Sequence, residues 1–518
     1  MMSTNDKIDI IEYGDYQTPV LFANSVCKKL KEQYKMKPDV VFEPTFGVGN
    51  FINASLDTFE NLKACFGVEI NPYYYELTKD SVTNKINTKI ELFNFDIFSF
   101  DFSLIKEQIN HKDNLLIVGN PPWVTNSQLT SNKNENIPLK TNFKRNSGLN
   151  AITGKGNFDI AEYIVLQLLS EFANYNCTIA LLCKTIVAKN VIRDMAKYNF
   201  NIEKSEIHTF NANVVFGVSC EACLFVAKLG NASSGICEVY DYDTHKKTRE
   251  FGWVNGSFCS DIDREGIIDI EGKSQFEWRQ GVKHDCAKVM ELKKKNNVLQ
   301  NGFGDELPFV VGNYIYPLLK SSDIKKHEIK ETNRFVIATQ KRVNEDTSFI
   351  KNKCPFVWKY LSSYEELLNN RKSVIYKKAP KFAMFGVGDY SYAKYKVGVS
   401  GFYKEPIFAL IYNEYPVMLD DTCYFLSFDD KKNAIITTAL LNSDVAQNFL
   451  KSIAFLESKR PYTKEILKRI DFVKLSENVD YAFVHNFAAT MSGDYFITKE
   501  DYENYTMNIC EKQLEFAI

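Results

Sequence analysis

The first half of the chain repeats a short apolar segment at a nearly constant spacing, and each segment ends at a polar residue. The segments predicted to be strands are 39–43, 64–70, 89–96 and 114–119. The polar residues at their ends are Glu43, Glu69, Asp96 and Asn120, separated by 26, 27 and 24 residues. Each spacing equals the length of one strand–helix unit, in which a helix returns the chain to the start of the next parallel strand. The pattern therefore predicts an α/β fold with a doubly wound, mostly parallel sheet.

The same alternation continues after the fourth strand. We expect a helix over 159–175 with Asp159 as its N-cap, followed by strands at 178–183, 206–210 and 221–227. Ligands of doubly wound sheets bind beyond the carboxyl ends of the strands. The polar strand ends therefore predict a ligand site at that edge.

A polar segment rich in Lys, Asn and Ser, 126–157, separates the fourth strand from this helix. A long irregular segment beside a site is often a lid or a substrate-binding loop. A solvated insertion without contact to a substrate is the other interpretation, and the sequence leaves both open.

At 518 residues the chain is too long for one ordinary domain. The turn-rich NASSG at 231–235 indicates a boundary, after which the pattern changes to mixed short strands and helices. We expect four parts: a first domain over 1–235, a linker over 236–290, a second, α+β domain over 291–475 and a helical tail over 476–518.

The segment FEPTFGVGNF at 42–51 has the features of a cofactor loop. Gly47 and Gly49 allow a ligand to approach the backbone closely, although Ile52 replaces the last glycine of a full GxGxxG. Glu69 follows at the distance where an acid accepts from two ribose hydroxyls, and Asp96 is suited to an adenine amino group. This set fits NAD and S-adenosylmethionine equally well. Strand ends that merely face solvent are the alternative interpretation.

The tetrapeptide NPPW at 120–123 favours S-adenosylmethionine over NAD. The Asn120 oxygen and the Pro121 carbonyl can both accept from one NH₂ group, and the two prolines fix the backbone without offering a competing N–H. Trp123 offers a face for stacking. Such a grip on a planar amine suits methyl transfer, whereas a dehydrogenase has no use for it.

Together these motifs resemble those of the amino-group DNA methyltransferases of bacterial type II restriction-modification systems, in the gamma motif order: donor site, NPP-aromatic, target-recognition domain. The resemblance is strong over about 1–230 and looser beyond. It implies a Rossmann-like class I methyltransferase domain that binds S-adenosylmethionine, followed by a target-recognition domain over 291–475. Trp123 departs from the pattern, since Tyr or Phe is commoner there, but it preserves stacking.

The resemblance assigns roles to individual residues. YQTP (16–19) and FEPT (42–45) correspond to segments near the methionine part of the donor, VEINP (68–72) to the ribose strand and FDIF (95–98) to the adenine contact. The implied donor-binding residues are Thr18, Glu43, Thr45, Gly47, Gly49, Glu69, Ile70, Asp96, Ile97 and Asn120. VVFGVSCEACLFV (214–226) corresponds to the segment whose aromatic residue packs on the extruded base. The implied catalytic residues are Asn120, Pro121, Pro122, Trp123 and Phe216.

The activity implied by the resemblance is methylation of N6 of a flipped adenine in double-stranded DNA, which protects host DNA. N4 of cytosine is the nearest alternative, although Ser is more usual than Asn in that motif. Enzymes that methylate RNA or protein glutamine with an NPP-aromatic site are a further alternative. A non-catalytic DNA-binding protein with a relict methyltransferase fold is the alternative of another class.

The segment 371–404 is the strongest nucleic-acid signal in the second half. It contains eight Lys or Arg against one acid, Asp389, with eight interleaved Tyr or Phe. A solvated edge strand with protective lysines is the alternative interpretation. Segments 278–285 and 458–463 are weaker candidates. The expected DNA contacts are Lys377, Lys378, Lys381, Tyr390, Tyr392, Lys394, Lys396, Lys459 and Arg460.

Composition indicates where such a protein acts. The N-terminal segment has no apolar core of a signal peptide, no stretch reaches the length of a membrane span, and twelve scattered cysteines indicate reduced thiols in the cytoplasm. The CxxC of Cys220 and Cys223 lacks the further ligands of a zinc site, so no metal is expected. We expect a monomer whose partners are DNA and a separately encoded restriction endonuclease.

Overall fold

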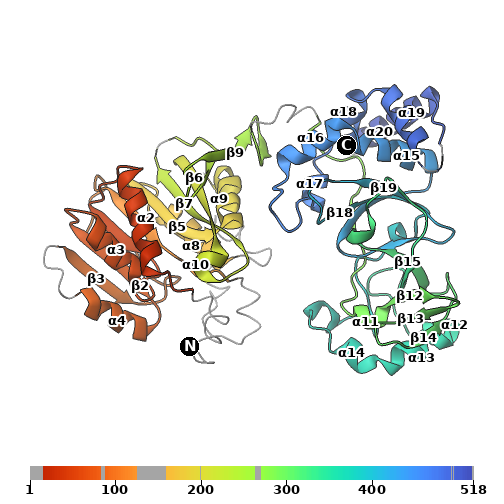
Figure 1. Ribbon diagram of the computed structural model, residues 1–518, viewed down its shortest axis with the longest axis horizontal. Helices are drawn as coiled ribbons and strands as arrows, with labels where there is room; N and C mark the ends of the chain where they lie inside the picture. Colours follow the sequence, from red (N-terminus) through yellow and green to blue (C-terminus); the bar gives the residue numbers. More distant parts are fainter. Residues whose placement is uncertain are drawn as a thin grey trace. The chain divides into compact units, whose positions relative to one another are not determined.

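The computed structural model describes residues 16–82, 88–124, 159–198, 200–230, 232–262, 270–491, 493 and 495–515. The chain divides into two compact units, Met1–Asp263 and Arg264–Ile518 (Figure 1). Within the described ranges, no helix has the length and apolar character needed to cross a membrane. The segment 126–157 lies outside the described residues.

The first unit is built on a ten-stranded sheet with the order β10-β9-β8-β6-β7-β5-β4-β1-β2-β3. Its strands are β1 (Val40–Glu43), β2 (Ala64–Glu69), β3 (Lys89–Asn94), β4 (Leu115–Gly119), β5 (Cys177–Lys184), β6 (Ile202–Asn211), β7 (Glu221–Leu229), β8 (Ile236–Asp241), β9 (Lys247–Val254) and β10 (Ser257–Cys259). The five strands from β5 to β3 in this order are parallel, and β7 is antiparallel to β5 and β6. The predicted doubly wound α/β sheet is thus confirmed.

Helices cover both faces of this sheet, so β1 buries side chains on both sides. The helices are α2 (Val20–Glu32), α3 (Asn50–Thr58), α4 (Pro72–Val82), α5 (Ser103–Lys106), α8 (Ile160–Glu171), α9 (Thr185–Tyr198) and α10 (Ala212–Phe216) (Figure 1). Val41 belongs to the core beneath α2 and α3. Phe42, on the other face, contacts the rings of Phe102 and Phe172. The Asp159 side chain accepts from the Ala161 amide, so the predicted N-cap of α8 is confirmed.

The structure moves the boundary that the sequence predicts at 231–235. Residues 232–235 lead directly into β8, which pairs in parallel with β6, with Cys237 opposite Ser205. The sheet continues through β9 and β10, so residues 236–262 belong to the first unit and are not a linker. Sequence pattern alone does not reveal this extension, because a turn before an added strand resembles a turn between domains.

The second unit contains two smaller sheets. The five-stranded sheet has the order β11 (Arg279–Gln280), β21 (Cys423–Phe428), β18 (Tyr395–Ser400), β19 (Phe408–Ile411) and β16 (Glu328–Ile329). The six-stranded sheet has the order β14 (Glu306–Pro308), β13 (Val298–Gln300), β12 (Glu291–Lys295), β17 (Arg334–Ile337), β15 (Ile315–Leu319) and β20 (Met418–Leu419). Short helices α11 (Ala287–Met290), α12 (Ile350–Lys353), α13 (Pro355–Ser363) and α14 (Glu365–Asn369) accompany them.

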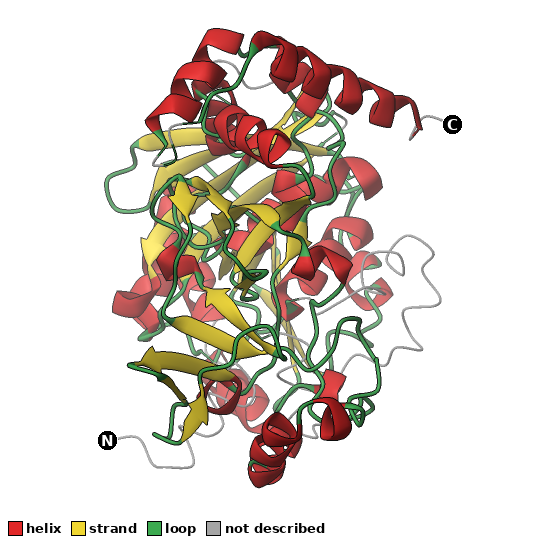
Figure 2. Cartoon of the chain, turned by 90° about the vertical axis from the view of Figure 1, so that its right-hand side faces the viewer, coloured by secondary structure: helices red, strands yellow, loops and turns green. Residues whose placement is uncertain are grey.

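The C-terminal helices complete the second unit's core. They are α15 (Lys431–Leu441), α16 (Asp444–Ile453), α17 (Lys464–Leu467), α18 (Phe472–Glu477), α19 (Tyr481–Thr490) and α20 (Lys499–Glu515), gathered at one end of the unit (Figure 2). Trp278, Val484 and Ile509 share one buried cluster. Residues 270–290, expected as linker, and 476–515, expected as a tail, are therefore integral to this unit.

Candidate active site

A cavity of about 520 Å³ opens at the carboxyl ends of β1, β2 and β4. Its volume lies within the range of roughly 300–1,000 Å³ that is typical of small-molecule sites. Five sequence motifs contribute to its lining: 16–18, 43–51, 68–74, 95–98 and 120–124, joined by Ile160 and Ile164 of α8. The motifs are far apart in sequence and meet here because the parallel strands end at one edge of the sheet.

The glycine loop after β1 has a backbone that requires glycine. Gly47 and Gly49 have φ values of 52° and 75°, in the left-handed region that side chains disfavour. A Cβ atom on Gly47 would lie 2.5 Å from Gln17 Oε1, which accepts a hydrogen bond of 3.0 Å from the Val48 amide. The loop is therefore shaped by the segment before α2 as well as by its own glycines.

Glu69 connects the glycine loop to the end of β2. Its two carboxylate oxygens accept from the Gly47 amide at 2.8 Å and from the Asn71 amide at 2.7 Å. The side chain is buried yet lines the cavity, next to the exposed Ile70. The sequence predicts a ribose acceptor here, and the structure adds that the same carboxylate holds the loop in shape.

Asp96 and Ile97 form the side of the cavity after β3. Asp96 Oδ1 accepts from the Phe98 amide at 3.0 Å. Burial raises the pKa of Asp96, and this bond partly offsets that rise. Ile97 is buried, and with Ile160 and Ile164 it gives the cavity an apolar wall.

Glu43 and Thr45 place unsatisfied oxygens in the cavity lining. Glu43 Oε2 and Thr45 Oγ1 are buried without a hydrogen-bond partner among the described residues. Burial raises the pKa of the Glu43 carboxyl well above its ordinary value; a backbone bond from Ile52 opposes the rise and the charge of Glu69 adds to it. A buried acid left in this state is suited to a cationic ligand.

The cavity fits S-adenosylmethionine on these observations. The unsatisfied oxygens of Glu43 and Thr45 suit a cationic amino-acid end, and Glu69 stands where hydroxyls are expected. Asp96 offers an acceptor beside the apolar wall, as an adenine ring with an amino group requires. Gly47 permits the close backbone approach.

Asn120 presents its amide oxygen as a buried acceptor. Its Nδ2 donates to the Tyr16 carbonyl at 3.0 Å, and because a carbonyl can only accept, this bond fixes the orientation of the carboxamide. Oδ1 is left buried without a partner among the described residues. Asn120 and Pro122 both line the cavity, whereas Pro121 is buried outside the lining.

Trp123 and Phe216 are arranged differently from the sequence prediction. Trp123 is only 5% exposed, and its indole N–H points to the Leu182 carbonyl at 3.4 Å. The Phe216 ring packs edge-on against it, with 5.1 Å between centroids. Neither residue lines the cavity. The Trp123 ring is thus buried, and the half-buried Phe216 packs against it.

The segment before α2 contributes more than the sequence indicates. Thr18, the residue named from the motif, is buried and uses its carbonyl to accept from Asn50 Nδ2 at 2.7 Å. The Tyr16 carbonyl accepts from Asn120 Nδ2, and the side-chain oxygen of Gln17 accepts from the Val48 amide, as described above. A backbone carbonyl has no signature in sequence, so only proximity to the YQTP motif could have indicated it.

Several of the expected DNA contacts meet on one surface of the second unit. We define the basic loop cluster as Arg279, Lys283, Lys377, Lys378, Lys459 and Arg460. Gln280 Nε2 and Arg460 Nη1 both donate to the Asp421 carbonyl, at 2.6 and 3.1 Å. The Tyr376 hydroxyl donates to the Lys283 carbonyl at 3.3 Å, which places Lys377 and Lys378 beside Lys283.

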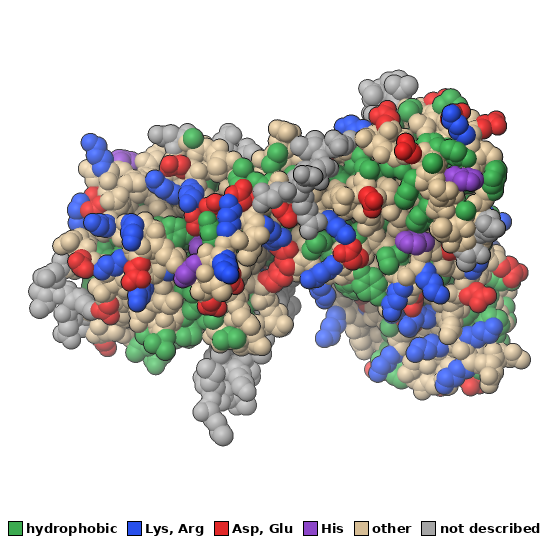
Figure 3. Space-filling view, turned by 45° about the horizontal axis from the view of Figure 1, so that its top comes forward, with side chains coloured by type: hydrophobic (Ala, Val, Ile, Leu, Met, Phe, Trp, Pro, Cys, Tyr) green, Lys and Arg blue, Asp and Glu red, His purple; other side chains and the backbone are tan. Residues whose placement is uncertain are grey.

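The charge of the basic loop cluster is partly neutralised. Arg279 pairs with Glu277, Lys283 with Asp285 and Arg460 with Asp421. Lys377, Lys378 and Lys459 are exposed and have no ion-pair partner within the described ranges. The guanidinium of Arg279 lies 4.3 Å from the centre of the Tyr390 ring. In Figure 3, Lys and Arg side chains outnumber acidic ones over the lower part of this unit.

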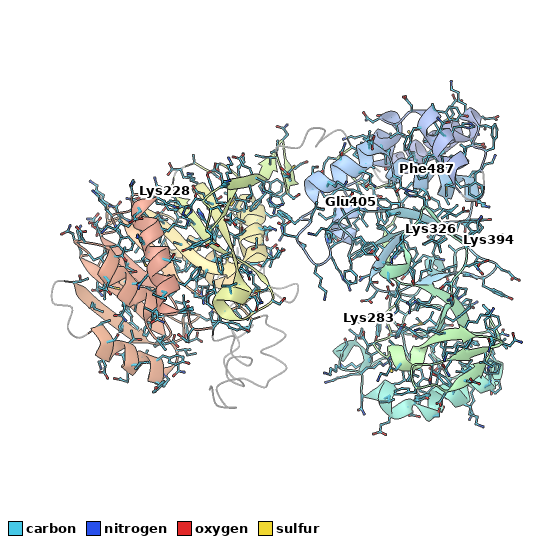
Figure 4. All side chains as sticks on the ribbon, viewed as in Figure 1. Lys228, Lys283, Lys326, Lys394, Glu405 and Phe487 are labelled. Atoms are coloured by element: carbon cyan, nitrogen blue, oxygen red, sulfur yellow. The ribbon has the colours of Figure 1, made fainter. Side chains whose placement is uncertain are left out.

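Other expected DNA contacts lie elsewhere. Lys396 is 1% exposed, and its Nζ donates to the Ala393 carbonyl at 2.7 Å, so it cannot reach DNA. Burial lowers the pKa of Lys396 to about 7. The Tyr392 hydroxyl donates to the Gln340 carbonyl at 2.8 Å, and Lys381 pairs with Glu365. Lys394 is exposed but lies at the opposite edge of the unit from Lys283 (Figure 4).

Comparison with known proteins places the chain in a family. No protein-family model matches it. The chain is 39% identical over 472 residues to the type II methyltransferase M.NspV of Nostoc sp. (strain ATCC 29411 / PCC 7524), covering 90% of this chain and 98% of that protein. The structure of the type IIL restriction-modification enzyme MmeI matches with a TM-score of 0.53 at 12% identity, covering 99% of this chain and 75% of MmeI.

The likeness to MmeI supports the fold of the whole chain, and the identity to M.NspV supports the family. The predicted class I methyltransferase fold is confirmed, with S-adenosylmethionine as the methyl donor. The chain belongs to the type II methyltransferases of restriction-modification systems.

Proposed function

We propose that this methyltransferase transfers a methyl group to N6 of adenine in double-stranded DNA. The observation that carries the proposal is the Asn120 carboxamide, whose Oδ1 is a buried acceptor without a described partner beside the donor cavity. A planar amine brings two N–H donors and needs acceptors of this kind. The bond from Nδ2 to the Tyr16 carbonyl holds the acceptor in place before a substrate arrives.

The proposed chemistry must overcome the low nucleophilicity of the amino nitrogen. The lone pair of an adenine amino group is delocalised into the ring, so the nitrogen is a poor nucleophile. Asn120 Oδ1 and the Pro121 carbonyl would accept both N–H bonds and favour a pyramidal nitrogen. S-adenosylmethionine supplies a methyl group on a positively charged sulfur. The protein's contribution is positioning and fixed dipoles, without a strong base before attack.

The target base must leave the duplex to reach this site, at a cost of a few kcal/mol. Contact with aromatic side chains offsets about 1–3 kcal/mol of that cost per ring. Because Trp123 is buried and the more exposed Phe216 packs against it, we infer that the base meets Phe216 first. Contact with Trp123 would require the two rings to separate.

DNA is the substrate class that best fits the second unit. The basic loop cluster offers three exposed lysines without a described acidic partner, and Arg279 stacked on Tyr390 joins a cation to an aromatic face. Cations for phosphates and aromatic rings for sugars or bases are what a DNA surface needs. MmeI, which shares the fold over 99% of this chain, has been solved in complex with DNA.

Two alternatives follow from the same geometry. N4 of cytosine is also a planar amine, and the Asn120 acceptor suits it in the same way. A protein glutamine would present a similar group but gives no reason for the basic loop cluster. RNA carries the same phosphates and would fit that cluster, and DNA is favoured over it because the chain belongs to the type II methyltransferases of restriction-modification systems. A relict, inactive fold is disfavoured by the three oxygens around one cavity that have no partner in the described part of the chain, since each destabilises a protein that binds nothing there.

Transfer of label from S-adenosylmethionine to unmethylated duplex DNA, RNA and protein tests the proposed substrate class. We expect label in DNA alone, and none with Asn120→Ala. Label in RNA or protein but not in DNA would contradict the proposal. Donor binding without transfer to any of the three would instead support the relict fold.

We further propose that the chain acts in the cytoplasm as a monomer and protects host DNA from a separately encoded endonuclease. The twelve cysteines are free thiols, as a reducing compartment requires. Long-read sequencing of DNA from cells that express the chain would reveal the modified sequence. The same DNA should resist cleavage by the partner endonuclease, and unmodified DNA should not.

A further inference from the structure

Lys184 lies at the carboxyl end of β5 and reaches the NPPW segment. Its Nζ donates to the Trp123 carbonyl at 2.8 Å and to Asp159 Oδ2 at 2.7 Å. The Lys184 side chain is 22% exposed and that of Asp159 is 9% exposed, so this ion pair is mostly shielded from solvent. Neither residue lines the donor cavity.

Asp159 connects Lys184 to the start of α8. Its other oxygen, Oδ1, caps the helix by accepting from the Ala161 amide at 3.1 Å. The Ile160 amide donates to the Val124 carbonyl at 2.9 Å, directly after NPPW. Two successive carbonyls, those of Trp123 and Val124, are thus tied to Lys184 and to the first turn of α8.

The NPPW segment needs such external donors because its prolines have no N–H of their own. Two prolines donate no backbone hydrogen bonds. Their position therefore depends on the donors that bind the neighbouring carbonyl groups. Ile160 and Ile164 of the same α8 also line the donor cavity. The position of α8 therefore affects both the NPPW segment, which is proposed to bind the target amine, and the wall of the donor cavity.

We propose that Lys184 is a positioning residue for methyl transfer, which sets the distance between the NPPW backbone and the α8 wall of the donor cavity. It acts through the Trp123 carbonyl and Asp159 and touches neither substrate. This inference rests on the proposed function, in which the NPPW segment binds the amino group of the target base. A misplacement of about 1 Å between reacting groups costs roughly 100-fold in rate.

Lys184→Met tests this role because methionine keeps most of the side-chain volume and loses the charge and both hydrogen bonds. Lys228→Met is the matched control: Lys228 is an exposed lysine on β7 opposite Thr178, at the other end of the same strand pair (Figure 4). We expect kcat for DNA methylation to fall about 10- to 100-fold in Lys184→Met. Affinity for S-adenosylmethionine, measured by calorimetry, should stay within about threefold. Lys228→Met should match wild type in both.

Hydrogen exchange gives a second readout that does not depend on turnover. In Lys184→Met, the amides of Asn120, Trp123, Val124 and 159–164 should exchange faster, while those of β1 and β2 keep their protection. Lys184→Arg retains a cation with several donors and should recover most of the lost kcat. Asp159→Asn keeps an N-cap but loses the charge, so it should show the same pattern at smaller size.

Three results would overturn the inference. Lys184→Met with kcat within twofold of wild type excludes a positioning role. A parallel fall of kcat, donor affinity and unfolding temperature also excludes it, because such a fall indicates a purely structural role. If Lys184→Met does not fold, unchanged kcat and unchanged exchange in Asp159→Asn exclude the positioning role as well. A wild-type protein that methylates no DNA contradicts the proposed function instead, and the exchange experiment still tests the Lys184 link.

Discussion

Three buried oxygens around the donor cavity, on Glu43, Thr45 and Asn120, have no hydrogen-bond partner among the described residues. An unsatisfied buried polar group destabilises a folded protein by about 1–3 kcal/mol. Such groups persist where a ligand supplies the missing hydrogen bond, so the ligand-free protein should be less stable than a variant without them. Single substitutions at these residues should therefore change stability and ligand binding separately.

Asn120→Ala removes the acceptor for the target amine. We expect turnover to fall about 100- to 1,000-fold, the size of effect seen when one preorganised hydrogen-bonding group is removed from a transition state. Binding of S-adenosylmethionine should survive, as measured by calorimetry. Asn174→Ala, at an exposed asparagine after α8, is the control and should behave as wild type. Undiminished turnover in Asn120→Ala would refute the role of Asn120.

Glu43→Gln should make the free protein more stable and the donor complex weaker. Because burial raises the pKa of Glu43, its contribution to stability is present at low pH and is lost as pH rises through the raised value. The variant should gain about 1 kcal/mol at pH 8, or roughly 2–4 °C in unfolding temperature, and nothing at pH 4. Donor affinity should fall about tenfold.

Thermal scans at the two pH values, with Glu107→Gln at an exposed site as control, check the Glu43 prediction. An unchanged unfolding temperature at pH 8, together with unchanged donor affinity, would show that no buried charge is relieved there.

Residue identity predicted where some of these side chains lie and missed others. Glu43, Glu69, Asp96 and Asn120 were predictable because polar side chains at regularly spaced strand ends must meet at one edge of the sheet. The packing of Phe216 against a buried Trp123 was not, since ring orientation depends on packing between segments far apart in sequence. Lys184 gave no signal, because a lysine at the end of a strand is usually solvated.

Among the elements, the glycine loop between β1 and α3 is the one that shapes the cavity most directly. Gly47→Ala would place a Cβ atom 2.5 Å from Gln17 Oε1, on a backbone with a φ of 52°. We expect a loss of stability of about 1–2 kcal/mol from the backbone alone and loss of donor binding from the displaced Gln17. Gly256→Ala is the matched control, because Gly256 has a φ of 83° but open space around it.

Calorimetric titration of both glycine variants with S-adenosylmethionine separates the effect of backbone strain from the effect of a changed cavity shape. Gly256→Ala should lose stability and keep donor affinity. Equal donor affinity in the two variants would mean that the contact of Gly47 with Gln17 is irrelevant to the cavity.

Strand β18 is buried along both faces, and this explains why Lys396 is not a DNA contact. Alternation of polar and apolar residues indicates an exposed strand face only when one face of the sheet is open. The Lys-Tyr-Lys of 394–396 suggests such a face, but the structure covers it. The number of layers around a strand is a property of the whole unit, so the local sequence could not predict it.

Lys396→Met should stabilise the second unit in a pH-dependent way. Burial lowers the pKa of Lys396 to about 7, while the pKa of lysine in an unfolded chain is about 10.4. The unfolded state therefore binds more protons between these values, and wild-type stability rises with pH across that window. The advantage of the variant should be greatest below pH 7, on the order of 3–5 kcal/mol, and vanish above pH 10.

Denaturant unfolding of Lys396→Met at pH 6 and pH 10 checks this, with the exposed Lys394→Met as control. DNA affinity should be unchanged in Lys396→Met. A stability difference that is independent of pH, or a loss of DNA affinity, would contradict the buried position of Lys396.

Across the whole molecule, the sequence predicted the fold class of each half better than it predicted the domain boundaries. The helix–strand alternation predicted the first sheet as far as β7, but β8 to β10 belong to it through pairing with β6, which no local pattern reveals. Trp278 and the C-terminal helices share a core although about 200 residues separate them in sequence. Such long-range contacts are not encoded in composition.

The basic loop cluster should carry a measurable part of the DNA affinity. Lys377→Met with Lys378→Met removes two adjacent exposed lysines, and the slope of log affinity against log salt should fall by about 2. Lys325→Met with Lys326→Met removes a similar exposed pair beside β16, at the opposite edge of the five-stranded sheet from β11. Equal slopes for the two double variants would place the DNA elsewhere.

The most direct test of the proposed function is the identity of the methylated base. Duplex DNA is incubated with the wild-type protein and S-adenosylmethionine, digested to nucleosides and analysed by mass spectrometry. We predict N6-methyladenine with the wild type and none with Asn120→Ala. N4-methylcytosine in the digest, or DNA that carries no methylated nucleoside at all, would contradict the assignment of adenine to the Asn120 acceptor.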